Sequence, residues 1–121
     1  MSKEVIQLKI SLNGAKPPIW RRIQLPQDAT FLDLHAAIQD AMGWADGHLH
    51  EFSFEQKSSK RPILIGPPNP DSMFETHAEK KELVCNWLGS KWKQCIYTYD
   101  FGDNWDHTVL FEKTLPAEPG V

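Results

Sequence analysis

Residues 5 to 13 alternate between apolar and polar side chains, and this alternation constrains the fold more than any other feature of the chain. The apolar positions are Ile6, Leu8, Ile10 and Leu12, and the polar positions between them are Gln7, Lys9 and Ser11. Because successive side chains of a β-strand point to opposite faces, the pattern predicts a strand with one buried face.

Four further strands are expected. Residues 19–25 follow a turn built on Asn13-Gly14 and Lys16-Pro17-Pro18, and they end at Pro26. In that strand Arg21 shares the apolar face, so its guanidinium has to reach solvent or a carboxylate. The third strand covers 48–55 and carries several rings on one face, namely His48, His50, Phe52 and Phe54. Residues 94–101 and 105–113 predict a closing hairpin.

Two helices are expected. Thr30 and Asp33 have the spacing of a capping box, and Gly43 supplies a helix end. Between them, apolar residues recur at helical spacing, namely Phe31, Leu34, Ile38, Ala41 and Met42. His35 lies next to this apolar stripe. Residues 79–88 predict a second, short amphipathic helix.

The predicted order is ββαβ, a loop, then αββ. The loop covers residues 56–78, with room for a short strand at 63–65 whose exposed edge could support pairing with a protein partner or a second copy. With 121 residues and no linker, we expect residues 1–121 to form a single α+β domain. Its mixed or antiparallel sheet would carry the helices on one face.

Charge and composition exclude several classes of protein. The formal net charge is −3, whereas nucleic-acid binders need clustered Lys and Arg to displace counterions from phosphates. The sequence shows neither a signal peptide nor an apolar run long enough to cross a membrane, so we expect a cytoplasmic protein. Cys85 and Cys95 suit that compartment as free thiols.

The hairpin can pair in two ways. A three-residue loop places Tyr99 opposite His107 and Asp100 opposite Asp106, and it collects the aromatic rings on one face. A two-residue loop instead places Asp100 opposite His107 and divides the rings between both faces. We favour the first register because sheet faces sort by polarity.

In the favoured register several carboxylates lie close together. Asp100, Asp106 and the turn residue Asp103 would form an oxygen-rich cluster suited to Mg, Mn or Ca, and zinc would require histidines to join it. The histidines available for that role are His107, His48 and His50. The alternative is that the aspartates only form the turn and that the histidines are satisfied at the edge of the core.

Four blocks of the sequence resemble the plasmid pRiA4b ORF-3-like family. They are Pro17-Pro-Ile-Trp-Arg-Arg22, Met42-Gly-Trp44, His48-Leu-His-Glu-Phe52 and Tyr97-Thr-Tyr-Asp-Phe-Gly-Asp-Asn-Trp-Asp-His107. The resemblance covers most of the chain and implies a small α+β fold. It also implies a further segment after the hairpin, so the chain is expected to be a short or truncated member.

The family blocks coincide with the polar residues selected above and suggest one shared site. Its expected ligand-binding residues are Trp20, Arg21, Arg22, His48, His50, Tyr99 and Trp105, and its expected metal ligands are Asp100, Asp103, Asp106 and His107. The leading hypothesis is a non-enzymatic binding or adaptor domain with a His/Asp/Arg/Trp pocket. The alternatives are a hydrolase with a divalent metal cofactor that activates water and a mobile-element accessory protein that contacts DNA.

Overall fold

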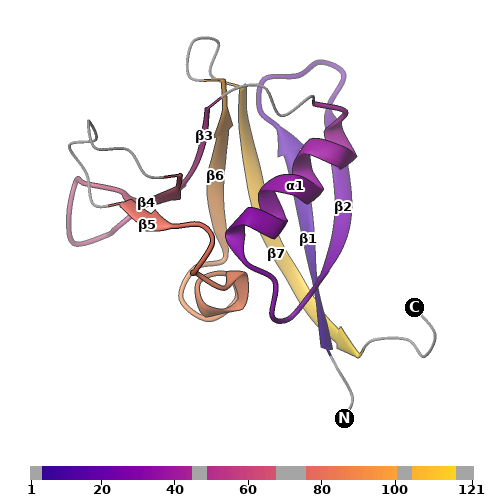
Figure 1. Cartoon of the computed structure of the whole chain (residues 1–121). Helices are drawn as coiled ribbons and strands as arrows, with labels where there is room; N and C mark the ends of the chain where they lie inside the picture. Colours follow the sequence, from indigo (N-terminus) through magenta and orange to yellow (C-terminus); the bar gives the residue numbers. More distant parts are fainter. Residues whose placement is uncertain (1–3, 45–48, 68–75, 101–104, 117–121) are drawn as a thin grey trace.

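The protein is built on one mixed sheet that carries a helix on one face (Figure 1). The structure, a computed structural model, describes residues 4–44, 49–67, 76–100 and 105–116. The strands are β1 (Glu4–Leu12), β2 (Ile19–Pro26), β3 (His50–Phe54), β4 (Ile63–Gly66), β5 (Thr76–Ala78), β6 (Gln94–Tyr99) and β7 (Trp105–Pro116). The helix α1 spans Phe31–Met42, and a 3-10 turn, η1, spans Val84–Asn86.

The strand order is β2-β1-β7-β6-β3-β4-β5, so β2 and β5 are the edge strands. Every neighbouring pair is antiparallel except β4 and β5, which run parallel. In Figure 1, α1 crosses in front of β1, β2 and β7, and β4 and β5 turn away at the opposite side. This arrangement leaves the second face of the sheet without a helix among the described elements.

The core lies between α1 and the inward side of the sheet. On β1 the apolar face is confirmed for Ile6, Leu8 and Ile10, which are buried, whereas Leu12 is only partly buried and Gln7 on the other face is buried as well. Ile6, Leu8 and Ile10 face apolar residues of α1 and of the central strands, among them Phe31, Leu34, Ile38, Phe52, Phe54, Tyr97 and Val109. An antiparallel sheet with one covered face accounts for the polar residues at the alternate positions.

The expected start and end of α1 are confirmed. The Thr30 hydroxyl accepts a hydrogen bond of 3.2 Å from the Asp33 N–H, and the Asp33 carboxylate accepts one of 2.9 Å from the Thr30 N–H. At the other end Gly43 has φ 77°, the left-handed conformation that glycine adopts without a steric penalty. These signals act within a few residues, which is why the sequence predicts them well.

The predicted fold class is wrong, because the sheet dominates and the described residues contain a single α-helix. Residues 79–88 do not form the second helix. The carbonyl groups of Glu79 and Glu82 accept hydrogen bonds from the N–H groups of Leu32 and Phe31, both 3.1 Å long. A helix of ten residues has only marginal stability in water. The hydrogen bonds with the start of α1 therefore stabilise the observed backbone path of residues 79–88 more than a helix would.

The element order also differs in the region predicted as a loop. Residues 63–66 form β4, in agreement with the expected short strand, but Thr76–Ala78 adds β5 beside it. The edge strand on this side is therefore β5, and 63–65 is covered by it. In a parallel pair, the connection has to carry the chain from the end of the first strand back to the start of the second. Such a connection is longer than the two-residue turn of a hairpin, so the sequence contains no hairpin turn that would indicate β5.

Neither predicted register of the hairpin is correct. Tyr97 pairs with His107, Thr98 with Asp106 and Tyr99 with Trp105, a shift of two residues from the favoured register. Two residues are the side-chain period of a strand, so the expected sorting of rings to one face and acids to the other is preserved. Phe101 lies outside the described residues, and Asp100 follows the end of β6 instead of facing Asp106.

Candidate functional site

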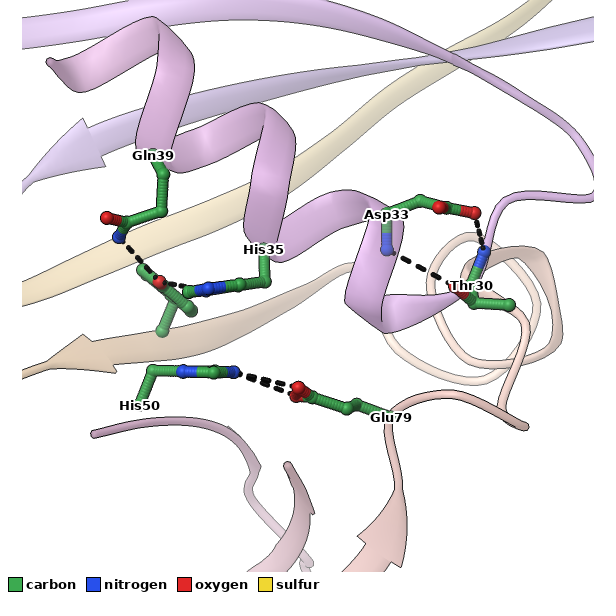
Figure 2. A network of polar contacts seen from close by, with 7 residues as sticks. Thr30, Asp33, His35, Gln39, His50 and Glu79 are labelled. Atoms are coloured by element: carbon green, nitrogen blue, oxygen red, sulfur yellow. Dashed lines mark hydrogen bonds and ion pairs between the residues drawn. The ribbon is translucent and has the colours of Figure 1, made fainter. Parts of the chain in front are cut away.

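Five polar side chains meet in the interior between α1 and the sheet, and we call them the buried polar cluster (Figure 2). His35 and Gln39 come from α1, His50 from β3 and Tyr97 from β6, and Glu79 follows β5. All five are buried. Polar groups at such depth are stable only when they find hydrogen-bond partners.

The Tyr97 hydroxyl joins the helix to the sheet. It lies 2.6 Å from His35 Nδ1 and accepts a hydrogen bond of 3.0 Å from Gln39 Nε2. His35 and Gln39 are four residues apart and therefore lie on one face of α1, which presents both groups to the same hydroxyl.

His50 and Glu79 form the second part of the cluster. His50 Nε2 lies 2.9 and 2.8 Å from the two carboxylate oxygens of Glu79 (Figure 2). The imidazole N–H is therefore shared between both oxygens of the carboxylate. The His50 ring also stacks on the His35 ring, with centroids 3.5 Å apart and planes inclined by 10°. The two histidines from different elements are thereby held face to face.

The sequence did not single out Glu79. The residue falls in the segment predicted as a helix and is separated from His50 by 29 positions, so no local spacing connects them. The available signal was indirect. His50 was expected on a face with Phe52 and Phe54, and a histidine on a buried face needs a hydrogen-bond partner.

His107 is fully buried beside the cluster. Its Nδ1 lies 3.2 Å from the Tyr97 carbonyl oxygen, and its Nε2 accepts a hydrogen bond of 3.2 Å from Trp44 Nε1. Burial lowers the pKa of His107, and hydrogen bonds to backbone groups and the Asp106 charge offset part of that effect. The structure therefore favours the neutral ring.

This environment predicts a pH dependence of stability. Because the pKa of His107 is lowered on folding from its ordinary value of 6.5, the unfolded chain binds the proton more tightly. The contribution of His107 is complete above pH 6.5 and is lost as the pH falls through the folded pKa. Urea unfolding between pH 7.5 and about pH 5 should show this loss, and the His107→Gln variant should show a shallower dependence. Equal slopes for both proteins would contradict the assignment.

Tyr99 and Trp105 lie at one end of the sheet with Trp44. The Trp44 ring centroid is 5.6 Å from that of Tyr99 and 5.8 Å from that of Trp105. Tyr99 is buried and pairs with His50 on one side and Trp105 on the other, while Trp105 is exposed. Of the expected ligand-binding residues, His50, Tyr99 and Trp105 are thus brought together across three strands.

The expected metal ligands are placed differently. Asp106 precedes His107 in β7, so its side chain points to the opposite face, where Asp106 Oδ1 accepts a hydrogen bond of 2.7 Å from the Thr98 hydroxyl. Asp100 has φ 63°, and its N–H donates to the Leu49 carbonyl over 2.8 Å. Asp103 and His48 lie outside the described residues. Within the described ranges, no three His, Cys, Asp or Glu residues are placed to hold a metal ion.

Trp20, Arg21 and Arg22 lie on the edge strand β2, apart from the buried polar cluster. Arg22 Nε lies 2.7 Å from Glu112 Oε1, and hydrogen bonding to Arg22 lowers the pKa of Glu112 to about 2. Lys9 Nζ and Arg22 Cζ lie 4.9 and 5.3 Å from the Trp20 ring centroid, a cation–π arrangement. We call Lys9, Trp20, Arg21 and Arg22 the basic edge.

The sequence of the chain matches the profile of a known protein family. The sequence profile described as "Plasmid pRiA4b ORF-3-like protein" matches residues 4–121. The chain belongs to this family. The resemblance of the four sequence blocks is therefore confirmed over nearly the whole chain.

Two other proteins are similar to this family member. The uncharacterized protein y4hQ of Sinorhizobium fredii is 32% identical over 118 residues, which cover 97% of this chain and 58% of y4hQ. MM3350, a protein of unknown function from Methanosarcina mazei Go1, has 43% sequence identity with this chain, and its crystal structure superposes on it with a TM-score of 0.86. The superposed region covers 100% of this chain and 66% of the MM3350 chain. The chain thus spans less than two thirds of the length of both relatives.

None of the helices in the described ranges is long and apolar enough to cross a bilayer.

Proposed function

We propose that this chain is a binding domain and that the basic edge is its contact surface for a partner protein. The observation that carries the proposal is the exposure of β2. Its residues from Ile19 to Arg22 are all exposed, although they belong to a strand. A strand at a sheet edge has backbone N–H and C=O groups that a second extended chain can pair with.

The distribution of the other expected site residues supports a binding role at this surface. His50 and His107 are buried and use their ring nitrogens in contacts with Glu79, Trp44 and Tyr97. Groups engaged in the interior contribute to stability, whereas a ligand has to meet exposed groups. Trp20 is 43% exposed and lies on the surface of the molecule.

Charge selects the class of partner. Arg21 Nη1 donates to the Trp20 carbonyl over 2.8 Å, and Arg22 and Lys9 flank the Trp20 ring. A second copy that paired through β2 would bring its own arginines against these, which costs energy. Arg22 already pairs with Glu112. An extended segment rich in Asp and Glu would instead meet the positive charge of Lys9 and Arg21, with Trp20 as the aromatic anchor. The proposed partner is therefore an acidic, extended segment of another protein.

A peptide titration tests this proposal. An eight-residue peptide that alternates glutamate and valine should bind, and a lysine–valine peptide of equal length should not. Trp20→Ala and Arg21→Glu should each weaken binding by about tenfold or more, because buried Trp and Arg anchors commonly contribute above 1 kcal/mol. Fluorescence anisotropy of the labelled peptide measures the affinity, and amide chemical shifts locate the contact.

Matched variants separate this surface from the other end of the sheet. Trp105 is 41% exposed, close to the 43% of Trp20, so Trp105→Ala is a control for the loss of an exposed indole. Arg61→Glu is the corresponding charge control at an exposed position. Weaker binding in Trp105→Ala but not in Trp20→Ala would place the contact elsewhere. Binding of a duplex DNA probe, but not of the acidic peptide, would favour the DNA-contacting alternative.

A further inference from the structure

A cavity of about 590 Å³ lies on the sheet face that α1 does not cover. It opens where the pairing of β3 with β6 stops, at Ser53 and Ile96. These two residues follow Phe52 and precede Tyr97, which are buried against α1, so their side chains point to the opposite face. The cavity is therefore separate from the buried polar cluster, and no residue of the basic edge lines it.

The indole of Trp92 forms a rigid wall of this cavity. Its Nε1 donates a hydrogen bond of 2.9 Å to the Glu55 carbonyl, which joins the segment before β6 to the segment after β3. Its ring stacks on the Trp87 ring, with centroids 5.4 Å apart, and packs against the Phe54 ring, with centroids 5.1 Å apart. A wall held by a hydrogen bond and two ring contacts is formed before any ligand arrives, which reduces the cost of binding.

The chemical character of the lining is cationic. Three lysines line the cavity, Lys57, Lys91 and Lys93, against one acidic residue, Glu55. In the described part of the chain, none of the three lies within 4.0 Å of a carboxylate, since the close contacts of basic side chains with carboxylates there belong to Arg22, His50 and His77. This concentration of positive charge occurs on a chain with a net charge of −3.

The remaining lining groups can add hydrogen bonds. Ser53 and Ser58 contribute hydroxyl groups, and Gln56 contributes an amide. A second cavity of about 460 Å³ shares Ser53, Glu55 and Gln56 with the first and adds Lys60. The volume of the first falls in the range of about 300–1,000 Å³ that is usual for small-molecule sites.

We propose that this cavity binds a compact multivalent anion of the phosphate class, with Lys57, Lys91 and Lys93 as the charged contacts. Lysine ammonium groups bind phosphate as point charges and need no fixed planar geometry, which suits flexible side chains at the rim of an open cavity. A long polyanion such as nucleic acid is disfavoured by the acidic net charge of the chain. The ligand is therefore a small molecule that carries a diphosphate or related group, either free or attached to an organic part.

Calorimetric titration with inorganic pyrophosphate at low ionic strength tests the site. The full chain should bind one pyrophosphate per molecule, and ADP should show whether an attached nucleoside strengthens binding. The Lys57→Gln/Lys93→Gln double variant should weaken pyrophosphate binding by about tenfold or more, because a hydrogen bond to a charged group contributes about 1.5–3 kcal/mol. Higher salt should reduce the difference.

The matched control is the Lys16→Gln/Lys113→Gln double variant, which removes the same charge from exposed lysines that do not line the cavity. This control should bind pyrophosphate nearly as tightly as the unmodified chain. Equal weakening in both double variants would show a general charge effect and overturn the site. Absence of saturable pyrophosphate binding, or binding of a single-stranded oligonucleotide alone, would also overturn it. Thermal unfolding of each variant verifies that the fold is retained, as expected for changes of exposed side chains.

Discussion

Replacement of Glu79 by alanine is expected to lower the free energy of unfolding by about 1–3 kcal/mol, the usual cost of leaving a buried hydrogen-bond donor without its partner. Glu79 is 5% exposed and accepts hydrogen bonds of 2.9 and 2.8 Å from His50. Without the carboxylate, the His50 N–H would remain in the interior with no replacement for that acceptor, because water does not reach it easily. Urea unfolding followed by circular dichroism measures the loss.

Two further variants make this prediction specific. Glu4→Ala removes an exposed carboxylate from the start of β1 and should change stability by no more than about 0.5 kcal/mol. Glu79→Gln keeps an acceptor oxygen of nearly the same position, so it should lose less than Glu79→Ala. A double-mutant cycle with His50→Ala should give a coupling above about 0.5 kcal/mol, as for residues in contact. Equal losses for Glu79→Ala and Glu4→Ala would contradict the role assigned to the pair.

Replacement of Phe31 by alanine is expected to destabilise the protein by about 3–5 kcal/mol, as for other buried Phe-to-Ala changes. The ring is fully buried, and its centroid lies 5.1 Å from that of Phe52 and 6.4 Å from that of Trp87. It therefore joins α1 to β3 and to the segment around η1. Truncation would leave a cavity that these rigid neighbours cannot fill, in addition to the lost burial of apolar surface.

The adjacent residue supplies the control for Phe31. Leu32 is partly exposed, so Leu32→Ala removes apolar atoms from the same helix turn with a smaller loss of burial. We expect Leu32→Ala to cost less than half as much as Phe31→Ala. Both variants keep the backbone hydrogen bonds of Phe31 and Leu32 to Glu82 and Glu79. Similar losses for the two variants would mean that the aromatic contacts of Phe31 contribute little.

Both predictions concern the junction between α1 and residues 79–84, where the expected second helix was wrong. The apolar spacing of Leu83, Val84, Trp87 and Leu88 fits a helix face, and three of these residues are indeed buried, namely Val84, Trp87 and Leu88. They are buried by a different backbone path. The Val84 N–H donates to the Ala29 carbonyl over 3.0 Å, a contact with the residue just before the helix cap. The apolar spacing in residues 79–88 therefore predicted which side chains are buried, but it predicted the wrong backbone conformation for this segment.

The candidate site was predictable only in part. The alternation of each strand predicted that His50, Tyr99 and His107 would face the interior, and all three are buried. It did not predict that His35 would stack on His50 or that Tyr97 would bind His35 across 62 positions of sequence. Nor did it separate Trp20, Arg21 and Arg22 from the histidines, since the strand order β2-β1-β7-β6-β3 was unknown.

The sequence by itself determined those features whose physical cause lies within a few residues. The Thr30 capping box, the end of α1 at Gly43 and the apolar face of β1 depend on local hydrogen bonds, backbone dihedral angles and side-chain period. Only the tertiary structure decided the register of β6 and β7, the path of residues 79–84 and the contact between His50 and Glu79. These depend on packing between segments far apart in the chain, where many alternatives satisfy the local preferences equally well and the total burial and hydrogen bonding select one.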